Sequence, residues 1–374
     1  MLPNPDNSLA YNNRRGGQLP RFLNPHIRIA LNLSGEGGTG MAKIVLGIAT
    51  SHGPLLSTPP DMWHLRAADD RKTSHPFRGG TYSFDELVTK RAGEDLAAKT
   101  SLEERRRRHA ACQAAIATLA RKWDEVKPDV AVIFGNDQME IFTDQNIPTF
   151  LVYYGETIEN APFPEQQRKR LPPGIQIAEP SHHPDTPQVY PGLPDLGLHI
   201  INELMANDFD VATAKHLPSR DNHTSIPHAF GFVYRKIMND RVVPNVPVFL
   251  NTFYPPNQPA TRRCLAMGKI VARAIERWAS DARVAVFASG GLSHFVVDEA
   301  LDMALLEGMR NNDEEALINI PADRFRSGSS EMKNWIPVAG IMMNRGLKMN
   351  LVDYVPCYRS EAGTGNAMAF VYWE

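Results

Sequence analysis

The sequence predicts a layered α/β/α fold whose central sheet is mixed but largely parallel. From Met41 onward, short and nearly continuous apolar runs alternate with longer segments of helical periodicity, a pattern typical of sheets covered by helices. Several of the apolar runs end in glycine and titratable residues, as strands do at the ligand-binding edge of such sheets. No internal repeat or composition break marks a second domain, so we expect residues 41–374 to form one domain.

The elements follow from local periodicity. Apolar runs predict strands at 44–50, 129–135, 149–155, 246–253, 284–289, 349–356 and 367–372. Apolar residues that recur every three or four positions predict helices at 102–125, 196–207, 261–279, 298–311 and 331–344. The proline-rich segment 156–194 is too long for an ordinary connection, and we expect it to form a lid or a binding loop.

Composition restricts the functional class. A hydrophobic content of 43% supports a full core, and the formal net charge of −2 argues against nucleic-acid binding as the main role. No apolar run approaches the roughly 20 residues that a membrane span needs. The three cysteines are widely spaced and form no CxxC motif, which fits a reducing compartment. The sequence therefore indicates a cytoplasmic globular protein.

The first forty residues differ from the rest. Residues 1–40 are rich in Asn, Gly, Pro and Arg and lack sustained periodicity. We expect either a disordered tail or an erroneous upstream start, with Met41 as the true beginning. A transit peptide would form an amphipathic helix, and none is convincing here.

Three predicted strand ends carry the candidate chemistry. His52 follows the first strand, Asn136, Asp137 and Gln138 follow the second, and His294 follows the glycines after the strand at 284–289. Strand ends that share one edge of a sheet suggest one cleft, most simply a catalytic one. No GxGxxG, Walker or GxSxG motif supports nucleotide binding or a serine nucleophile. Each histidine alone could equally be a structural, hydrogen-bonded residue.

Glu331 is a further candidate at the start of the last predicted helix. A carboxylate in a first helical turn is commonly a cap or a partner of the helix dipole. Its assignment to a site therefore depends on the wider pattern.

That pattern resembles the class III extradiol dioxygenases, in particular the catalytic β subunit of protocatechuate 4,5-dioxygenase and the gallate and 3-O-methylgallate enzymes. The resemblance rests on ordered segments from Met41 to the C-terminus: ATSHGP, AVIFGNDQMEIF, DNHTSIP, PVFLNTFYPP, SGGLSH, SEMKNW and GTGNAMAF. It implies a mononuclear non-haem Fe(II) centre held by two histidines and one carboxylate, with open positions for a catechol-type substrate and O₂. The implied activity is extradiol ring cleavage that incorporates both atoms of O₂.

The resemblance also implies roles for individual residues. His52 matches the first histidine ligand and Glu331 matches the carboxylate ligand. His294 matches an acid–base histidine outside the coordination sphere, and His223 matches a pocket histidine that contacts the substrate.

One position departs from the family pattern. Where the second histidine ligand is expected, this chain has Gln138, whose amide oxygen is a weaker ligand for Fe(II). Gln138 could bind the metal directly, Asp137 could contribute a carboxylate, or the site could bind metal poorly. Alternatively, a histidine from elsewhere could complete the triad; the candidates are His64, His75, His109 and His228.

Substrate and partners are less constrained. Arg66 is a candidate for binding a substrate carboxylate, with a surface salt bridge as the alternative, and the arginine run 105–108 is expected to be a solvated helix face. The related enzymes often pair this chain with a small α subunit, and we expect a homo-oligomer here. Two other functions stay open: a metal-dependent hydrolase on a similar fold, and a non-catalytic binding protein derived from the dioxygenases.

Overall fold

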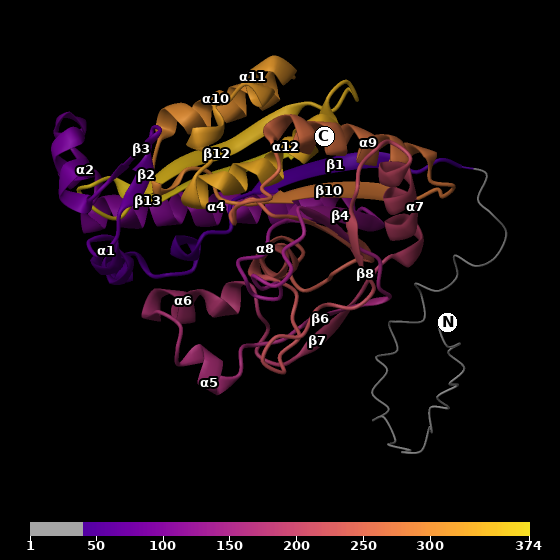
Figure 1. Cartoon of the computed structure of the whole chain (residues 1–374), viewed down its shortest axis with the longest axis horizontal. Helices are drawn as coiled ribbons and strands as arrows, with labels where there is room; N and C mark the ends of the chain where they lie inside the picture. The colour runs from indigo at the N-terminus through magenta and orange to yellow at the C-terminus, as the bar shows by residue number, and fades with distance from the viewer. Residues whose placement is uncertain (1–39) are drawn as a thin grey trace, which may run out of the picture. The chain divides into compact units, whose positions relative to one another are not determined.

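The computed structural model describes residues 40–374, and the alternatives considered for residues 1–40 lie outside this range apart from Gly40. A nine-stranded sheet runs through it in the order β11-β13-β1-β10-β4-β9-β5-β8, with β12 paired to β13 (Figure 1). The strands are β1 Lys43–Thr50, β4 Val130–Gly135, β5 Phe150–Tyr153, β8 Ala212–Ala214, β9 Asn245–Leu250, β10 Arg283–Ser289, β11 His294–Val296, β12 Met349–Tyr358 and β13 Thr364–Trp373.

The centre of the sheet is parallel. Strands β1, β10, β4 and β9 pair in parallel, and so do β5 and β8. The pairing of β5 with β9 and all pairings of β13 are antiparallel. The predicted mixed sheet is therefore confirmed, with its parallel strands at the centre.

Helices cover both faces of the sheet (Figure 1). The helices are α1 His64–Asp70, α2 Phe84–Lys90, α3 Leu96–Lys99, α4 Leu102–Val126, α5 Glu165–Arg168, α6 Pro173–Ala178, α7 Pro194–Met205, α8 His228–Phe232, α9 Thr261–Arg277, α10 Glu299–Arg310, α11 Glu314–Ile318 and α12 Trp335–Met342. Alternate residues of β10 point into different cores. Val284 and Val286 pack on the side of α7, α9, α10 and α12, and Ala285 and Phe287 pack on the side of α4 and α8. This is the predicted three-layer arrangement.

Local chemistry explains the main helices. The hydroxyl of Ser101 caps α4 by accepting the backbone N–H of Glu104 at 3.2 Å. A β-carbon on Gly268 would lie 2.0 Å from the carbonyl oxygen of Pro337, so glycine permits the close approach of α9 and α12. In residues 40–374, no helix is both long and apolar enough to span a membrane.

One local prediction was wrong. The predicted helix 331–344 begins at Trp335, because the preceding residues Ser327–Asn334 wind into a tighter 3-10 helix. The proline-rich segment 156–194, expected to be a lid or a binding loop, has regular elements of its own. It contains a hairpin of β6 (Thr157–Asn160) and β7 (Gln188–Pro191) with α5 and α6 between them.

Candidate active site

Three side chains from distant parts of the chain meet at the carboxyl edge of the parallel sheet. His52 follows β1, His294 begins β11, and Glu331 lies in the 3-10 helix before α12. The Nε2 atom of His52 is 3.2 Å from Oε2 of Glu331, and Nε2 of His294 is 3.8 Å from the same oxygen. The parallel pairing of β1 with β10 explains the convergence, because Thr50 lies opposite Ser289 and both strands end at this edge.

The orientation of His52 is determined by its other ring nitrogen. The hydroxyl of Ser289 donates to the carbonyl of Ala229 at 2.6 Å, so its oxygen accepts from Nδ1–H of His52 at 2.9 Å. Nε2 therefore keeps its lone pair, and this buried atom has no hydrogen-bond partner within residues 40–374. Burial lowers the pKa of His52, which favours the neutral imidazole.

Glu331 is held by donors on both carboxylate oxygens. The backbone N–H of Gly291 donates to Oε2 at 2.8 Å, while the amides of Gln138 and Asn136 donate to Oε1 at 2.8 and 3.3 Å. Burial opposes the charged form, but the electrostatic influence of His52 and His294 outweighs it and lowers the pKa of Glu331. The carboxylate is thus ionised and fixed within the protein.

His294 is positioned by tight packing. Its Nδ1–H donates to the carbonyl of Leu292 at 2.7 Å, which leaves the lone pair of Nε2 on the side of Glu331. β-carbons on Gly291 and Gly328 would lie 2.5 and 2.0 Å from atoms of the ring, so both positions require glycine. Burial lowers the pKa of His294 as well.

The loop that carries His294 is anchored to α10. Both the backbone N–H and the hydroxyl of Ser293 donate to Asp302 at 2.7 Å, and the hydroxyl of Tyr354 donates to the same carboxylate at 2.7 Å. Burial raises the pKa of Asp302 to about 7. This network was not recognised from the sequence, because Asp302 resembles any acidic residue near the start of a helix.

Gln138 lies beside Glu331 but presents its amide nitrogen to it. Its amide oxygen accepts a long hydrogen bond of 3.4 Å from the hydroxyl of Tyr254. Asn334 supports Asn136, which also bonds to Glu331. Its side-chain amide donates to the side-chain oxygen of Asn136 at 2.8 Å and to the carbonyl of Ser289 at 3.0 Å. The amides of this edge thus serve mainly to hold the carboxylate.

His228 forms a second charged pair next to His52. Its Nδ1 lies 2.5 Å from Oε1 of Glu140, and its backbone N–H donates to Oε2 of Glu140 at 3.0 Å. The rings of His228 and His52 are 4.7 Å apart between centroids, edge to face. Burial opposes the charged form of His228, but Glu140 outweighs it and raises the pKa of His228 to about 9.

His223 is not in contact with the three converging side chains. Its Nε2 lies 3.3 Å from the carbonyl of Ala161, and its ring is 5.7 Å from that of Phe163. A row of rings connects it to His228: His223 and His183 are 6.4 Å apart, His183 and His182 are 4.6 Å apart, and His182 and His228 are 5.7 Å apart. The sequence analysis overlooked His182 and His183, although two adjacent histidines in a proline-rich segment are a visible signal.

The remaining candidates have other partners. His64, His75 and His109 each bond through a ring nitrogen to a backbone carbonyl, at 2.7, 2.8 and 3.2 Å. The carboxylate of Asp137 accepts three backbone N–H groups, from residues 140–142, at 3.0 to 3.1 Å. Burial nevertheless raises the pKa of Asp137 to about 7.

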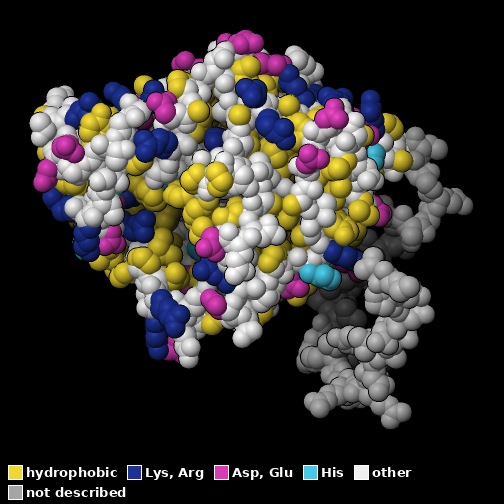
Figure 2. Space-filling view, viewed as in Figure 1, with side chains coloured by type: hydrophobic (Ala, Val, Ile, Leu, Met, Phe, Trp, Pro, Cys, Tyr) yellow, Lys and Arg dark blue, Asp and Glu magenta, His cyan; other side chains and the backbone are white. Residues whose placement is uncertain are grey.

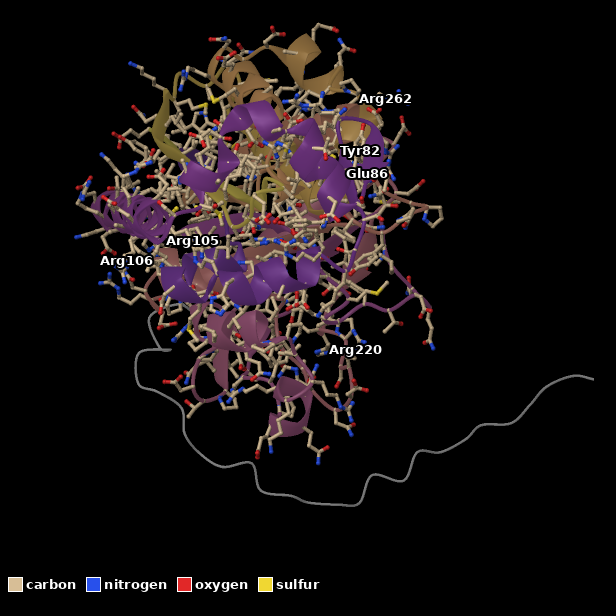
Figure 3. The ribbon with its side chains drawn as sticks, turned by 90° about the vertical axis from the view of Figure 1, so that its left-hand side faces the viewer. Tyr82, Glu86, Arg105, Arg106, Arg220 and Arg262 are labelled. Atoms are coloured by element: carbon tan, nitrogen blue, oxygen red, sulfur yellow. The ribbon has the colours of Figure 1, made fainter. Side chains whose placement is uncertain are left out.

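The arginine candidates differ in their burial and in their partners. Arg66 is half-buried and makes no side-chain hydrogen bond or ion pair within residues 40–374, so the expected alternative of a surface salt bridge is not seen. Arg106 is exposed, as a solvated face requires, and Figure 3 shows it near the left edge of the molecule. Arg105 is half-buried and donates to the carbonyl of Thr100 at 2.8 Å. Arg108 is a correction: it is buried, donating to Glu104 at 2.7 Å and to the carbonyl of Pro356, because its side of α4 packs against β12.

The structure also bears on the metal that the resemblance implies. As they stand, no three His, Cys, Asp or Glu side chains of residues 40–374 gather closely enough to hold a metal ion. Two donors do fit: an ionised, fixed carboxylate and a buried imidazole nitrogen with an unused lone pair. The face drawn in Figure 2 is hollowed toward the left of the view, and hydrophobic side chains line much of the hollow.

Comparison with known proteins adds the family. The model of the catalytic LigB subunit of aromatic ring-opening dioxygenase matches residues 101–368, a range that includes Glu331 and His294 but not His52. An uncharacterized protein of Escherichia coli K12 is a distant structural neighbour, with a TM-score of 0.39 and 14% identity over 69% of this chain and 91% of that chain. The resemblance drawn from the sequence motifs is confirmed, and the chain belongs to the LigB family of catalytic subunits of aromatic ring-opening dioxygenases.

Proposed function

We propose that the chain is a non-haem Fe(II)-dependent extradiol dioxygenase that cleaves a catechol-type aromatic, such as protocatechuate, gallate or a methylgallate, with O₂. One observation carries the proposal: the unpartnered Nε2 of buried His52 lies 3.2 Å from the carboxylate of Glu331. Donor atoms about 2.1 Å from one ion, on adjacent octahedral positions, are about 3 Å apart. The pair therefore has the spacing of two ligands of one metal.

His52 and Glu331 are the proposed iron ligands, and Gln138 is the third residue beside them. A bound ferrous ion would supply coordination sites for the diol and O₂ and the redox chemistry of ring opening. The protein would supply orientation and proton transfer. Ser289 and Gly291 support an orienting role of the protein, because they hold His52 and Glu331 by hydrogen bonds of 2.9 and 2.8 Å, respectively.

His294 is the proposed acid–base residue. Its Nδ1–H is bonded to a carbonyl, so Nε2 is free to take a proton from a substrate hydroxyl and return it to the product. Its lowered pKa keeps the ring neutral near pH 7, the state that a base requires. The distance of 3.8 Å to Glu331 places it beside the metal ligands without a hydrogen bond to them.

Arg66 and His223 are the proposed contacts for substrate substituents. The charge of Arg66 is among those that lower the pKa of His294, after burial and Arg359, which puts it within electrostatic reach of the acid–base residue. A half-buried guanidinium without an anionic partner is suited to a carboxylate. His223 ends the row of rings that begins at His228, so it would contact parts of the substrate remote from the diol.

Oxygen uptake tests the proposal. The full chain, purified without oxygen and supplied with Fe(II), should consume one O₂ per molecule of protocatechuate, gallate or 3-O-methylgallate and give an ultraviolet-absorbing ring-opened product. Light scattering on the same sample tests the expected homo-oligomer. Protein that binds Fe(II) but consumes O₂ with none of these diols would contradict the proposed activity.

A further inference from the structure

We propose that His228, and not the residue at position 138, supplies the third protein ligand of the metal, and that Gln138 positions Glu331. The inference rests on the proposed function for the presence of a metal. It concerns which side chain closes the coordination sphere, where this chain departs from the pattern of its family at Gln138.

The first step is the orientation of Gln138. A glutamine binds a cation through its amide oxygen, but here the amide nitrogen faces the site and donates to Oε1 of Glu331 at 2.8 Å. The oxygen accepts from Tyr254 instead. Asn136 makes the same kind of contact at 3.3 Å. Both amides therefore hold a carboxylate that acts as a ligand, and neither presents a lone pair to the metal.

The second step is the position of His228. Two imidazoles bound through Nε2 at right angles on one ion, each about 2.1 Å away, have ring centres about 4.5 Å apart. The rings of His52 and His228 have centroids 4.7 Å apart and planes at 81°. The ring of His182, another buried histidine that faces His228, is farther away, at 5.7 Å between centroids.

The third step is the preparation of the ring. Metal-binding histidines usually donate their second N–H to a carboxylate, a carbonyl or a hydroxyl, which fixes the lone pair on the ligating nitrogen. His228 has the second N–H of this arrangement through Glu140, at 2.5 Å, as His52 has it through Ser289, and binding a metal would displace the proton on Nε2 of its charged ring. Glu140 also accepts the backbone N–H of His228, so both of its carboxylate oxygens contact His228.

The fourth step is the movement that binding requires. Residues 40–374 hold no ready three-ligand cluster, so the ring of His228 must turn toward the pair formed by His52 and Glu331. Its side chain is 22% exposed, and apart from Nδ1 its ring makes no hydrogen bond to any residue from 40 to 374. A rotation about the contact with Glu140 would break no other hydrogen bond of the ring nitrogens within this part of the chain, whereas Gln138 would have to break its bond to Glu331.

Anaerobic titration of the metal-free full chain with Co(II) tests the inference, followed by the cobalt absorption bands. We expect His228→Ala to weaken Co(II) binding by 100-fold or more and Gln138→Ala to weaken it by less than 10-fold. His182→Ala is the matched control, since it removes a neighbouring buried imidazole and should leave affinity unchanged. The double variant Gln138→His/His228→Ala should regain much of the lost affinity.

A second readout does not depend on affinity or on the stability of one variant. The Co(II) protein should show two paramagnetically shifted imidazole N–H protons in its NMR spectrum, and Glu140→Gln should perturb one of them. If His228→Ala bound Co(II) with wild-type affinity while Gln138→Ala lost affinity, the inference would be overturned but the proposed function would stand. A wild-type chain that binds no Co(II) or Fe(II) would instead remove the proposed function, and the inference with it.

Discussion

His52 and Glu331 face each other across the carboxyl edge of the sheet, with Nε2 of the imidazole 3.2 Å from Oε2 of the carboxylate. Burial lowers the pKa of His52, and in the neutral form of the ring Nδ1 carries the proton bonded to Ser289 while Nε2 presents a lone pair. Two lone pairs opposed in a buried site repel, and a shared cation removes the repulsion. This arrangement supports the proposal that the pair binds a metal.

Ser289→Ala should weaken metal binding. The substitution removes the acceptor of Nδ1–H on His52, so the ring loses its fixed tautomer and orientation. Loss of such a supporting hydrogen bond typically costs 10- to 100-fold in metal affinity. Anaerobic Fe(II) titration measures the effect. Ser280→Ala is the control, a buried serine near the opposite end of β10, and equal affinities in the two variants would contradict the prediction.

His294→Gln should reduce turnover while the metal is retained. Loss of a general acid–base residue costs about 10²- to 10⁴-fold in rate. Because burial lowers the pKa of His294 below 6.5 and the neutral ring is the active form, wild-type activity should fall only as pH drops through that lowered pKa. The variant should lose this acid limb. Turnover measured against pH, with metal content measured in parallel, checks the loss of rate and the loss of the acid limb. His109→Gln is the control, because His109 is bonded to a backbone carbonyl.

The sequence supports the fold and part of the site for physical reasons. Fully buried strands such as β4 and β10 are continuous apolar runs, and their parallel arrangement brings His52 and His294 to one edge. β11 was missed because a strand of three residues that starts at His294 has no measurable periodicity. Glu331 was assigned to a regular helix because local propensity does not distinguish a 3-10 turn from a first α-helical turn.

The role of His228 lay beyond sequence reasoning. It was one of four histidines named as replacements for the missing ligand, and nothing in its neighbours along the chain separates it from the other three. The distinction comes from Glu140 and His52, which reach His228 only through tertiary packing. Contacts with a carboxylate and with another ring across such long sequence separations cannot be inferred from patterns in a single sequence.

Arg66→Gln should impair carboxylated substrates selectively. A charge-assisted bond to a substrate carboxylate is worth about 1.5–3 kcal/mol, so KM for protocatechuate should rise about 10- to 100-fold. Catechol, which lacks the carboxylate, should be turned over with little change. Arg71→Gln, at an exposed arginine just after α1 that pairs with Glu361, is the matched control. Equal losses for both substrates would assign Arg66 a structural role instead.

Asp70→Asn should destabilise the fold near the end of α1. Arg359 donates to both oxygens of Asp70 at 2.7 Å, and the two side chains are only 1% and 8% exposed. The substitution leaves a buried guanidinium without its counter-charge, which typically costs about 3–5 kcal/mol. Urea unfolding at pH 7 measures the loss. The exposed pair of Arg71 with Glu361 is the control, and Glu361→Gln should cost at most about 1 kcal/mol.

The same pair predicts how stability responds to acid. Burial raises the pKa of Asp70, but its hydrogen bonds and charge interaction with Arg359 outweigh burial, and the net pKa is lowered. A lowered pKa in the folded state means that this stabilisation is complete above the ordinary value of 3.8 and is lost as pH falls below it. Asp70→Asn should therefore be less stable than wild type at pH 7, and the difference should shrink toward pH 3. A stability difference that does not depend on pH across this range would show that ionised Asp70 is not what neutralises Arg359.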